Sequence, residues 1–582
     1  MKNLATLLIL LIVPALVLNC HTALAADGTW NVDADGDWST SANWASGTVA
    51  DGAGNTANFT YNITTNRTVT VNSARTIGEI DFGSSASATG IFWTLDSGTL
   101  TLDNNGSPPV IAVASTVFRG EISSSLAGTA GFNKTGNNTL KISGNNGISG
   151  NVTVSAGILS TYNSDSLKNA DVIVSGGILD IGNGVDLTAK SLTVSGSGQI
   201  QARANNTIVN INVPMSIGKE GSIYTENNVQ GVTLNVNSNV TLTANAGFEL
   251  GGITNTLNIN KPITGAYNLK LKGKSGGSTH NVHFNLNATN SYTGITYIEA
   301  WSCSATVDLN THYCLPESTE LHLDVNVGSG TNSLHLDMNS YTQQVTKLIM
   351  NAGSGTYIEL MGNDDGIIIG KFSASGQLIY LTGGTIIAND EVSIGAPVII
   401  TNATLINNYR WASGTGHIDI YAGGKIGGAG KFDGAVTNYA GGTISAGEAD
   451  SIATLYVNNK LIMKPGSLYD WKFGDTTIGE ADRINCGALA LPTTENSITV
   501  NVIKTSGPTD PNDTLVLFQT TGINGDIDSI FMDYSAIPDI NKPVHPSLDG
   551  NNIVVSDFTP EPAMIFPLAM FILSFMRKIF RC

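Results

Sequence analysis

Three copies of one short pattern, each starting 20 residues after the last, constrain this chain more than any other feature. The copies begin at Val152, Val172 and Leu192, and each alternates apolar with polar residues, turns at glycine and resumes with apolar residues. Alternation is typical of a strand with one buried face, and glycine allows the positive φ of a tight corner. A fixed period means that each coil stacks on the previous one. The pattern predicts an all-β parallel β-helix with these three residues above one another inside it.

Looser copies of the pattern recur further along the chain, at residues 383–386, 423–426 and 441–444. We therefore assign residues 115–450 to the solenoid, which would hold roughly 17 coils about 4.8 Å apart. A β-sandwich would also have short strands bounded by glycine, but it would not require a constant period. The repeat favours the solenoid.

The charge of the chain bears on its partners. The sequence has 28 Lys and Arg against 46 Asp and Glu, a net charge of −18 in 582 residues. Such a chain is repelled by phosphate backbones, so we expect no nucleic-acid partner. No Cys and His cluster has the spacing of a zinc site, and we expect no cofactor.

The first 25 residues are typical of a signal peptide. Lys2 is followed by an apolar run at 4–18, and Ala23 and Ala25 fit a small-x-small cleavage site. The mature protein would begin near Ala26 and be extracellular or on the cell surface. A lipoprotein signal at Cys20 is the alternative.

We assign residues 26–114 to an N-terminal β cap region. Trp30, Trp38 and Trp44 recur within it, and an open solenoid end would otherwise expose strand edges. We interpret the three indoles as the hydrophobic core of this cap. An aromatic platform for sugars is the alternative.

Two segments resemble the autotransporter-associated β-strand repeat. Residues 132–146 run on into 150–159 as that repeat does, and 290–298 is a partial copy. The resemblance implies a right-handed β-helix. The stretch 441–522 is similar to the end of such passengers, so residues 451–550 are assigned to a C-terminal β region of that type. About 60 residues follow Gly522, too few for an autotransporter's membrane barrel.

After a linker at 551–559, the tail at 560–582 resembles a PEP-CTERM sorting signal. An apolar run at 563–576 lies between a Pro-Glu-Pro motif and a basic end, which physically suits a membrane segment with a cytoplasmic stop. We expect hydrophobic helices at both ends of the chain. The sorting residues are Pro560, Glu561, Pro562, Arg577, Lys578 and Arg581.

The sorting resemblance implies several partners. They are an exosortase-type processing enzyme, exopolysaccharide, and the inner membrane. The membrane is contacted transiently through the tail of an anchored precursor. Whether the tail is cleaved or stays as an anchor is left open by the sequence.

Candidate catalytic or metal-binding residues are few. Asp364-Asp365 is an adjacent acidic pair, but its Asn-Asp-Asp-Gly context is turn chemistry. His322 with Asp324, and His335 with Asp337, would each share a strand face and could stack to bind a metal. A repeated solvent face is the simpler interpretation. The acids at 33–37 resemble a calcium loop only superficially. We therefore expect no catalytic, cofactor or metal residues.

Cys303 and Cys314 are close enough in sequence to pair around a short loop, and we expect them to be oxidised if they approach within about 7 Å. The resemblance to sorted PEP-CTERM proteins implies a non-enzymatic, secreted structural protein of the cell surface or extracellular matrix. The alternative is a β-helix carbohydrate-active enzyme or polysaccharide-binding protein, which a groove lined by several carboxylates would favour.

Overall fold

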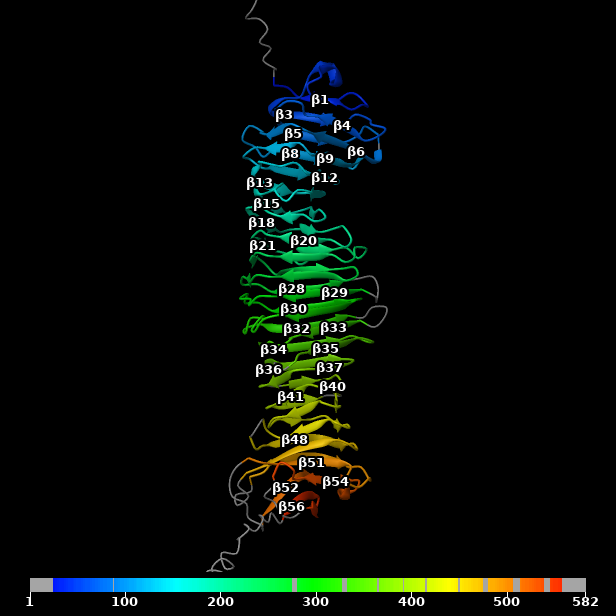
Figure 1. Cartoon of the computed structure of the whole chain (residues 1–582), viewed down its shortest axis with the longest axis vertical. Helices are drawn as coiled ribbons and strands as arrows, with labels where there is room; N and C mark the ends of the chain where they lie inside the picture. The colour runs from blue at the N-terminus through cyan, green and yellow to red at the C-terminus, as the bar shows by residue number, and fades with distance from the viewer. Residues whose placement is uncertain are drawn as a thin grey trace, which may run out of the picture. The chain divides into compact units, whose positions relative to one another are not determined.

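The computed structural model describes residues 25–556 except 87, 275–279, 327–331, 364–365, 391, 414–415, 449–450, 475–479, 506–512 and 538–544. The chain divides into two compact units, unit 1 at residues 1–274 and unit 2 at residues 275–582. Within each unit, short parallel strands pair from coil to coil, as Figure 1 shows. The prediction of an all-β parallel solenoid is confirmed.

Unit 1 contains three main ladders, to which successive strands of each coil contribute in turn. The first ladder consists of β1 (Gly28–Thr29), β3 (Gly52–Phe59), β5 (Arg75–Phe82), β8 (Val110–Val113), β11 (Phe132–Thr135), β13 (Ser149–Val154), β15 (Asn169–Val174), β18 (Ser191–Val194), β21 (Met215–Ile217), β24 (Val240–Leu242) and β27 (Ile263–Thr264). The second consists of β2 (Gly36–Asp37), β4 (Arg67–Thr70), β6 (Ala88–Asp96), β9 (Val117–Ile122), β12 (Thr139–Ile142), β14 (Ile158–Thr161), β16 (Ile178–Ile181), β19 (Gln199–Gln201), β22 (Ile223–Thr225), β25 (Ala246–Leu250) and β28 (Leu269–Lys274).

The third ladder of unit 1 consists of β17 (Asp186–Leu187), β20 (Ile208–Ile211), β23 (Thr233–Val236) and β26 (Asn255–Ile259). In the early coils, β7 (Thr99–Leu102) pairs with β5 and with β10 (Ser125–Ala127). Helical structure in the described part of the chain consists of the short 3-10 turns η1 (Ser41–Asn43), η2 (Ala45–Gly47) and η4 (Ile527–Ser529).

The 20-residue period appears directly as strand register. Val152 on β13 pairs with Val172 on β15, and Val172 pairs with Leu192 on β18. All three side chains are buried inside the coil. The predicted stacking is therefore confirmed, because the alternation placed each apolar residue on the same inner face.

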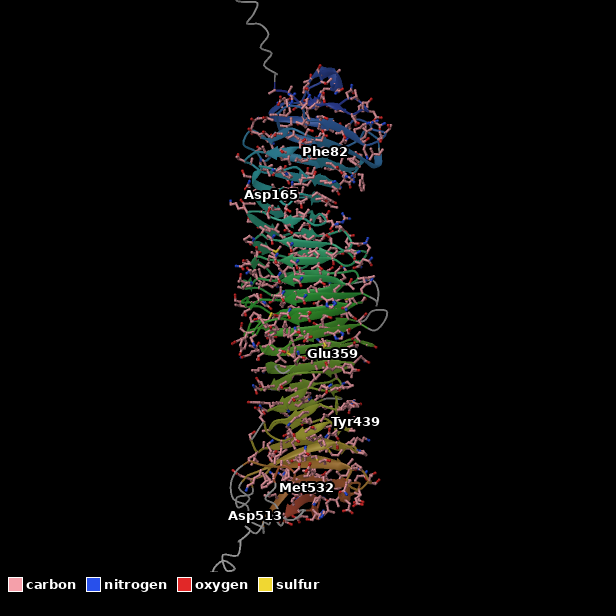
Figure 2. The ribbon with its side chains drawn as sticks, viewed as in Figure 1. Phe82, Asp165, Glu359, Tyr439, Asp513 and Met532 are labelled. Carbon is pink, nitrogen blue, oxygen red and sulfur yellow. The ribbon has the colours of Figure 1, made fainter. Side chains whose placement is uncertain are left out.

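The first coils of unit 1 enclose an aromatic cluster. Trp30, Trp38 and Trp44 are buried, and all three rings lie within 6.2 Å of the Phe59 ring, centroid to centroid. Phe59 in turn stacks on Phe82, labelled in Figure 2, with centroids 5.8 Å apart. The indoles are thus core residues, and as buried rings they cannot serve as the sugar platform considered from the sequence.

Outward amides of the third ladder bond from coil to coil. Asn210 donates to Asp186 at 2.7 Å, Asn235 donates to Asn210 at 2.8 Å, and Asn258 donates to Asn235 at 2.7 Å. Asn210 and Asn235 each donate one of these hydrogen bonds and accept another, so a row of side-chain amides links successive coils on the outer surface.

Unit 2 also has three ladders. The first consists of β29 (Asn281–Leu286), β31 (Ser304–Leu309), β33 (Ser333–Asp337), β35 (Tyr357–Met361), β37 (Ile379–Leu381), β40 (Val398–Ile400), β43 (Ile418–Ile420) and β46 (Val436–Asn438). The second consists of β30 (Thr296–Trp301), β32 (Glu320–Asn326), β34 (Gln343–Ala352), β36 (Ile367–Gly376), β39 (Val392–Ile394), β42 (Arg410–Ser413), β45 (Lys431–Phe432), β48 (Thr454–Met463), β50 (Arg483–Ala490) and β52 (Thr514–Thr520).

The third ladder of unit 2 starts from the first residues of β34 and β36. It continues through β38 (Thr385–Ala388), β41 (Thr404–Asn407), β44 (Lys425–Gly427), β47 (Thr443–Ser445), β49 (Leu468–Phe473), β51 (Ile498–Lys504) and β54 (Ile530–Asp533). The long strand β48 joins two ladders, since it pairs with both β45 and β46.

The parallel pattern stops at the end of unit 2. After β52 and the short β53 (Ile523–Asn524), the chain forms an antiparallel hairpin of β55 (Ser547–Asp549) and β56 (Asn552–Ser556). β56 pairs antiparallel with β52. Gly550 supplies the positive φ, +59°, that the two-residue turn of this hairpin requires.

The predicted leader and tail lie outside the described residues. These include Ala23 of the cleavage site, both hydrophobic end segments and the six sorting residues, whereas Ala25 falls at the start of the described chain. Within residues 25–556 as described, no helix has the length and apolar character needed to cross a membrane.

Candidate functional site

One outward column of side chains follows the second ladder of unit 1. Register pairs place one residue per coil in this column, in the order Glu121, Lys141, Ser160, Asp180 and Gln201. Side chains alternate along a strand, so the buried leucines beside these residues point inward and the column points outward. Ser160 and Asp180 are nevertheless only 4% and 7% exposed, which shows that this part of the outer face is recessed.

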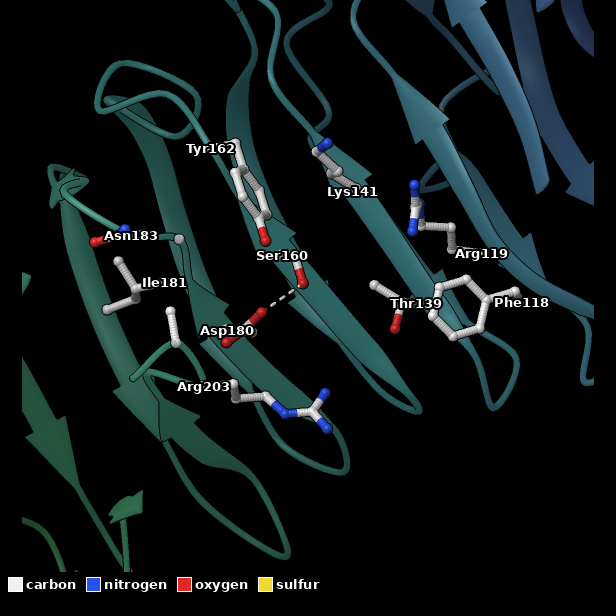
Figure 3. Close-up of a pocket in the computed structure, with 12 residues that line it drawn as sticks. Phe118, Arg119, Thr139, Lys141, Ser160, Tyr162, Asp180, Ile181, Asn183 and Arg203 are labelled. Atoms are coloured by element: carbon white, nitrogen blue, oxygen red, sulfur yellow. Dashed lines mark hydrogen bonds between the residues drawn. The ribbon is translucent and has the colours of Figure 1, made fainter. Parts of the chain in front are cut away.

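The recess is a cavity of about 300 Å³, within the size range of small-ligand sites. Figure 3 shows it open across β9, β12, β14 and β16. Its lining residues are Phe118, Arg119, Thr139, Lys141, Ser160, Tyr162, Asp180, Ile181, Gly182, Asn183, Arg203 and Ala204.

Asp180 lies at the floor of this cavity. Its Oδ2 accepts a hydrogen bond from the Ser160 hydroxyl at 2.8 Å, drawn as a dashed line in Figure 3. Its Oδ1 is buried and accepts no hydrogen bond of ordinary geometry among the described residues, although the backbone N–H of Arg203 lies near enough to the carboxyl to act against the rise in its pKa. Burial raises the pKa of the Asp180 carboxyl, because desolvation disfavours its charged form. A buried acceptor without a donor is a place where a hydroxyl-bearing ligand gains a hydrogen bond.

Two cations border the cavity on the side of β9 and β12. Arg119 pairs with Glu121, and its guanidinium carbon lies 3.7 Å from the centre of the Phe92 ring. Lys141 Nζ lies 3.6 Å from Glu121 and 4.6 Å from the centre of the Tyr162 ring. These contacts fix both cationic side chains over aromatic faces rather than leaving them free in solvent.

Arg203 borders the opposite side of the cavity. Its Nε lies 3.6 Å from a carboxylate oxygen of Glu226, and both side chains are at least one third exposed. Glu226 and Glu121 do not line the cavity, so the lining itself carries three cations against the single carboxylate of Asp180.

Two aromatic rings stand exposed at the ends of the recess. Phe118 precedes Arg119 on β9 and is 52% exposed, whereas Tyr162 follows β14 and is 49% exposed. Figure 3 shows the two rings on opposite sides of the cavity, with the Tyr162 hydroxyl directed toward Ser160. Aromatic faces beside hydrogen-bonding groups suit a ligand that is apolar on one face and polar at its edges.

The two His-Asp motifs are not brought together. His322 on β32 pairs in register with Tyr297 and Ile349, whereas His335 on β33 belongs to a different ladder. His335 Nδ1 contacts Glu359 Oε2 at 2.7 Å. The stacked arrangement considered from the sequence is therefore wrong, because consecutive strands of a coil lie on different faces. Among the described residues, no group of three or more His, Cys, Asp or Glu could hold a metal.

Two further acidic candidates have other outcomes. Asp364 and Asp365 lie outside the described residues. In the calcium-like segment, Asp33 binds Arg67 at 2.7 Å and the Thr64 hydroxyl at 2.7 Å. The hydrogen bond from Arg67 lowers the pKa of Asp33 to about 2. This carboxylate joins consecutive coils and is occupied by protein donors.

The expected disulfide does not form. Cys303 and Cys314 are both free and buried. Cys303 directly precedes β31 and Cys314 follows it, so the six-residue strand alone separates them by roughly 17 Å. Disulfides require Cα atoms within about 7 Å. The expectation failed because the segment between the two cysteines is an extended strand rather than a loop.

The cavity residues were missed in the sequence, although a signal for them was present. The aligned repeats ended at Leu159, Leu179 and Ile200, one position before Ser160, Asp180 and Gln201. At the same column in earlier coils stand Glu121 and Lys141. An outward column that changes from Glu to Lys to Ser to Asp, within a chain rich in Asn, Ser and Thr, marks a local departure from a plain solvent face.

The ladders and the recess together define a parallel β-solenoid protein with an outward-facing cavity. No protein-family model and no curated protein matches the chain. The crystal structure of the Haemophilus influenzae Hap adhesin is similar at a TM-score of 0.26 and 11% identity, over 84% of this chain and 64% of the adhesin. The match thus spans less than two thirds of the adhesin, and a likeness of this size does not bear on function.

Proposed function

We propose that the protein is a secreted, non-enzymatic structural component of the cell surface or of an exopolysaccharide matrix. The observation that carries this proposal is the joining of coils on the outside as well as the inside. The amide series from Asn210 to Asn258 links neighbouring coils at hydrogen-bond distances, while Val172 and its register partners fill the interior. Coils that are joined both inside and outside form a rigid element, which suits a structural protein outside the cell.

The ends of the chain supply the proposed route. Residues 1–25 direct export, with cleavage after Ala25, and the tail at 560–582 retains a precursor in the inner membrane. An exosortase-type enzyme then acts near Pro562. The coils are right-handed, as the resemblance to the autotransporter-associated repeat implies.

Intact-mass measurement of the surface-exposed protein tests this route. The expected product begins near Ala26 and ends near Pro562. A surface form that still ends at Cys582 would make the tail a permanent anchor, and the sorting proposal would fall.

A second candidate is polysaccharide binding, and the cavity over β14 and β16 favours it. Glycoside hydrolysis generally uses a pair of carboxylates, whereas the lining offers one carboxylate with aromatic faces and cationic donors. Such a composition supports holding a sugar rather than cleaving it.

A further inference from the structure

We propose that the cavity around Ser160 and Asp180 binds an acidic saccharide, a sugar unit that carries a carboxylate or sulfate within a longer glycan. The inference deepens the extracellular role proposed above and rests on it, since glycans are met outside the cell. It concerns a site that is complete within unit 1.

The first step concerns the shape and depth of the site. Ser160 and Asp180 belong to an outward column but are almost fully buried, so the recess is a built feature of the ladder rather than a gap between flexible side chains. The recess is open along the face of the solenoid. A cavity of about 300 Å³ is large enough to admit a sugar unit.

The second step concerns hydrogen bonding. The buried Oδ1 of Asp180 accepts no hydrogen bond of ordinary geometry among the described residues, while Oδ2 is held by Ser160. A sugar hydroxyl supplies the donor that this oxygen lacks, and leaving such a group unpaired costs free energy. An inorganic anion has no hydroxyl to donate in this way when fully ionised.

The third step concerns the aromatic rings. Phe118 and Tyr162 are about half exposed, so part of each ring is open to a ligand that enters the recess. Their faces suit the apolar C–H face of a pyranose ring, and one ring stands at each end of the recess.

The fourth step concerns charge. Arg119, Lys141 and Arg203 reach the lining, and their carboxylate partners Glu121 and Glu226 lie outside it. Counted with Asp180 and these partners, the three cations meet three carboxylates, so the lining presents cationic donors to the cavity without a net positive charge. Arg guanidinium groups bind carboxylates and sulfates in a forked geometry. The charged substituent of the sugar is therefore expected near Arg203 or Arg119.

Titration calorimetry on the full-length protein with three saccharide probes tests the site. The probes are tetragalacturonic acid, a sulfated heparin tetrasaccharide and neutral maltotetraose. We expect one or both anionic probes to bind at least tenfold more tightly than the neutral one, with affinity falling as salt rises. The two anionic probes decide between carboxylate and sulfate.

The variants Arg203→Gln and Tyr162→Ala should each raise Kd at least tenfold for the anionic probe that binds. Arg410→Gln and Tyr409→Ala are the matched controls, because they remove an exposed Arg and an exposed Tyr from unit 2. Circular dichroism should show all four variants folded.

If neutral maltotetraose bound as tightly as the two anionic probes, the proposal that the ligand is an acidic saccharide would be overturned. Absence of binding by all three probes, or unchanged affinity in both cavity variants, would overturn the site itself. Neither result depends on the ends of the chain, so failure here is distinguishable from failure of the export and sorting proposal.

Discussion

Lys472 and Asp482 form an ion pair inside unit 2, with Nζ 3.0 Å from Oδ2 and neither side chain more than 3% exposed. Both charged groups also form hydrogen bonds to other residues. Ala453 N–H donates to Asp482 at 2.9 Å, and Lys472 Nζ donates to Ser445 Oγ at 3.0 Å and to the carbonyl of Ala446. The pair therefore ties β47, β49 and the start of β50 together.

Removing one member of this pair should be costly. Lys472→Met leaves Asp482 buried without its cation, and breaking a buried pair from one side costs about 3–5 kcal/mol. Denaturant unfolding measures the loss in free energy of unfolding, and hydrogen exchange of the β47–β50 amides shows where that loss is located. Arg410→Gln is the control, because Arg410 is 69% exposed in its pair with Asp433 and its loss should cost less than about 1 kcal/mol. Equal stability of Lys472→Met and the parent chain would contradict the prediction.

A charge in the stacked interior should disrupt the repeat. Val172→Asp places a carboxylate between Val152 and Leu192 and should destabilise unit 1 by several kcal/mol, on the order of 3 or more. Thr193→Asp, at an outward position of β18, should change stability little. Thermal unfolding of both variants checks this, and similar melting temperatures would contradict the inward assignment.

The repeat could be predicted because its signal is local and periodic. Alternation alone places Val152, Val172 and Leu192 inward, and constant spacing then stacks them. The faces to which consecutive strands belong depend on corners between strands. For that reason His322 and His335, and Cys303 and Cys314, could not be placed correctly from spacing in sequence.

Lys134 should make stability depend on pH in the alkaline range. Its buried Nζ donates to the carbonyls of Thr135, Gly136 and Ala156 at 2.7, 3.0 and 3.1 Å, and desolvation lowers its pKa from 10.5 to about 8. Between these values the unfolded chain binds a proton that the folded chain has released. The contribution of Lys134 to the free energy of unfolding therefore rises as pH increases from about 8 to 10.5.

The measurement is the difference in unfolding free energy between the parent chain and Lys134→Met, taken from pH 7 upward. The difference should grow in favour of the parent chain through this window. Lys168→Met, which removes an exposed lysine of the same unit, is the matched control variant. A difference that shrinks with pH for Lys134→Met would contradict the lowered pKa.

The buried cysteines should be inert in the folded protein. Burial raises the pKa of Cys303 to about 11 and that of Cys314 to about 12, so almost no thiolate exists at pH 8. Iodoacetamide should leave both unmodified in folded protein and alkylate both in guanidinium without reductant, as read by mass. Lys190→Cys, at an exposed position, should react while folded. Thiols that stay blocked after unfolding would indicate a disulfide.

The sorting proposal predicts a trapped precursor. Alanine at Pro560, Glu561 and Pro562 should leave uncut protein in the membrane fraction, because the apolar run and basic end still hold the tail. Alanine at residues 557–559 is the matched control and should be processed normally. Release of the Pro-Glu-Pro variant at the normal mass would contradict a role for that motif.

The cavity shows the limit of reading a solenoid from one sequence. Asp180 and Ser160 belong to no sequence motif that identifies a ligand, and the changing residue types of their column show only that this outer face is not uniform. Their significance comes from burial, from the orphaned Oδ1, and from Arg203, which lies one coil away. Each of these properties depends on how neighbouring coils stack in three dimensions, which the spacing of residues in the sequence does not reveal.

The antiparallel hairpin at the end of unit 2 has a consequence for assembly. A parallel ladder ending in a bare strand offers its N–H and C=O groups to the first strand of another molecule, and copies could then add without limit. β56 covers β52 in the opposite direction, and the outermost strand beyond it, β55, is three residues long. At that edge, a partner chain finds only a three-residue strand to pair with, so the addition of further copies there is disfavoured.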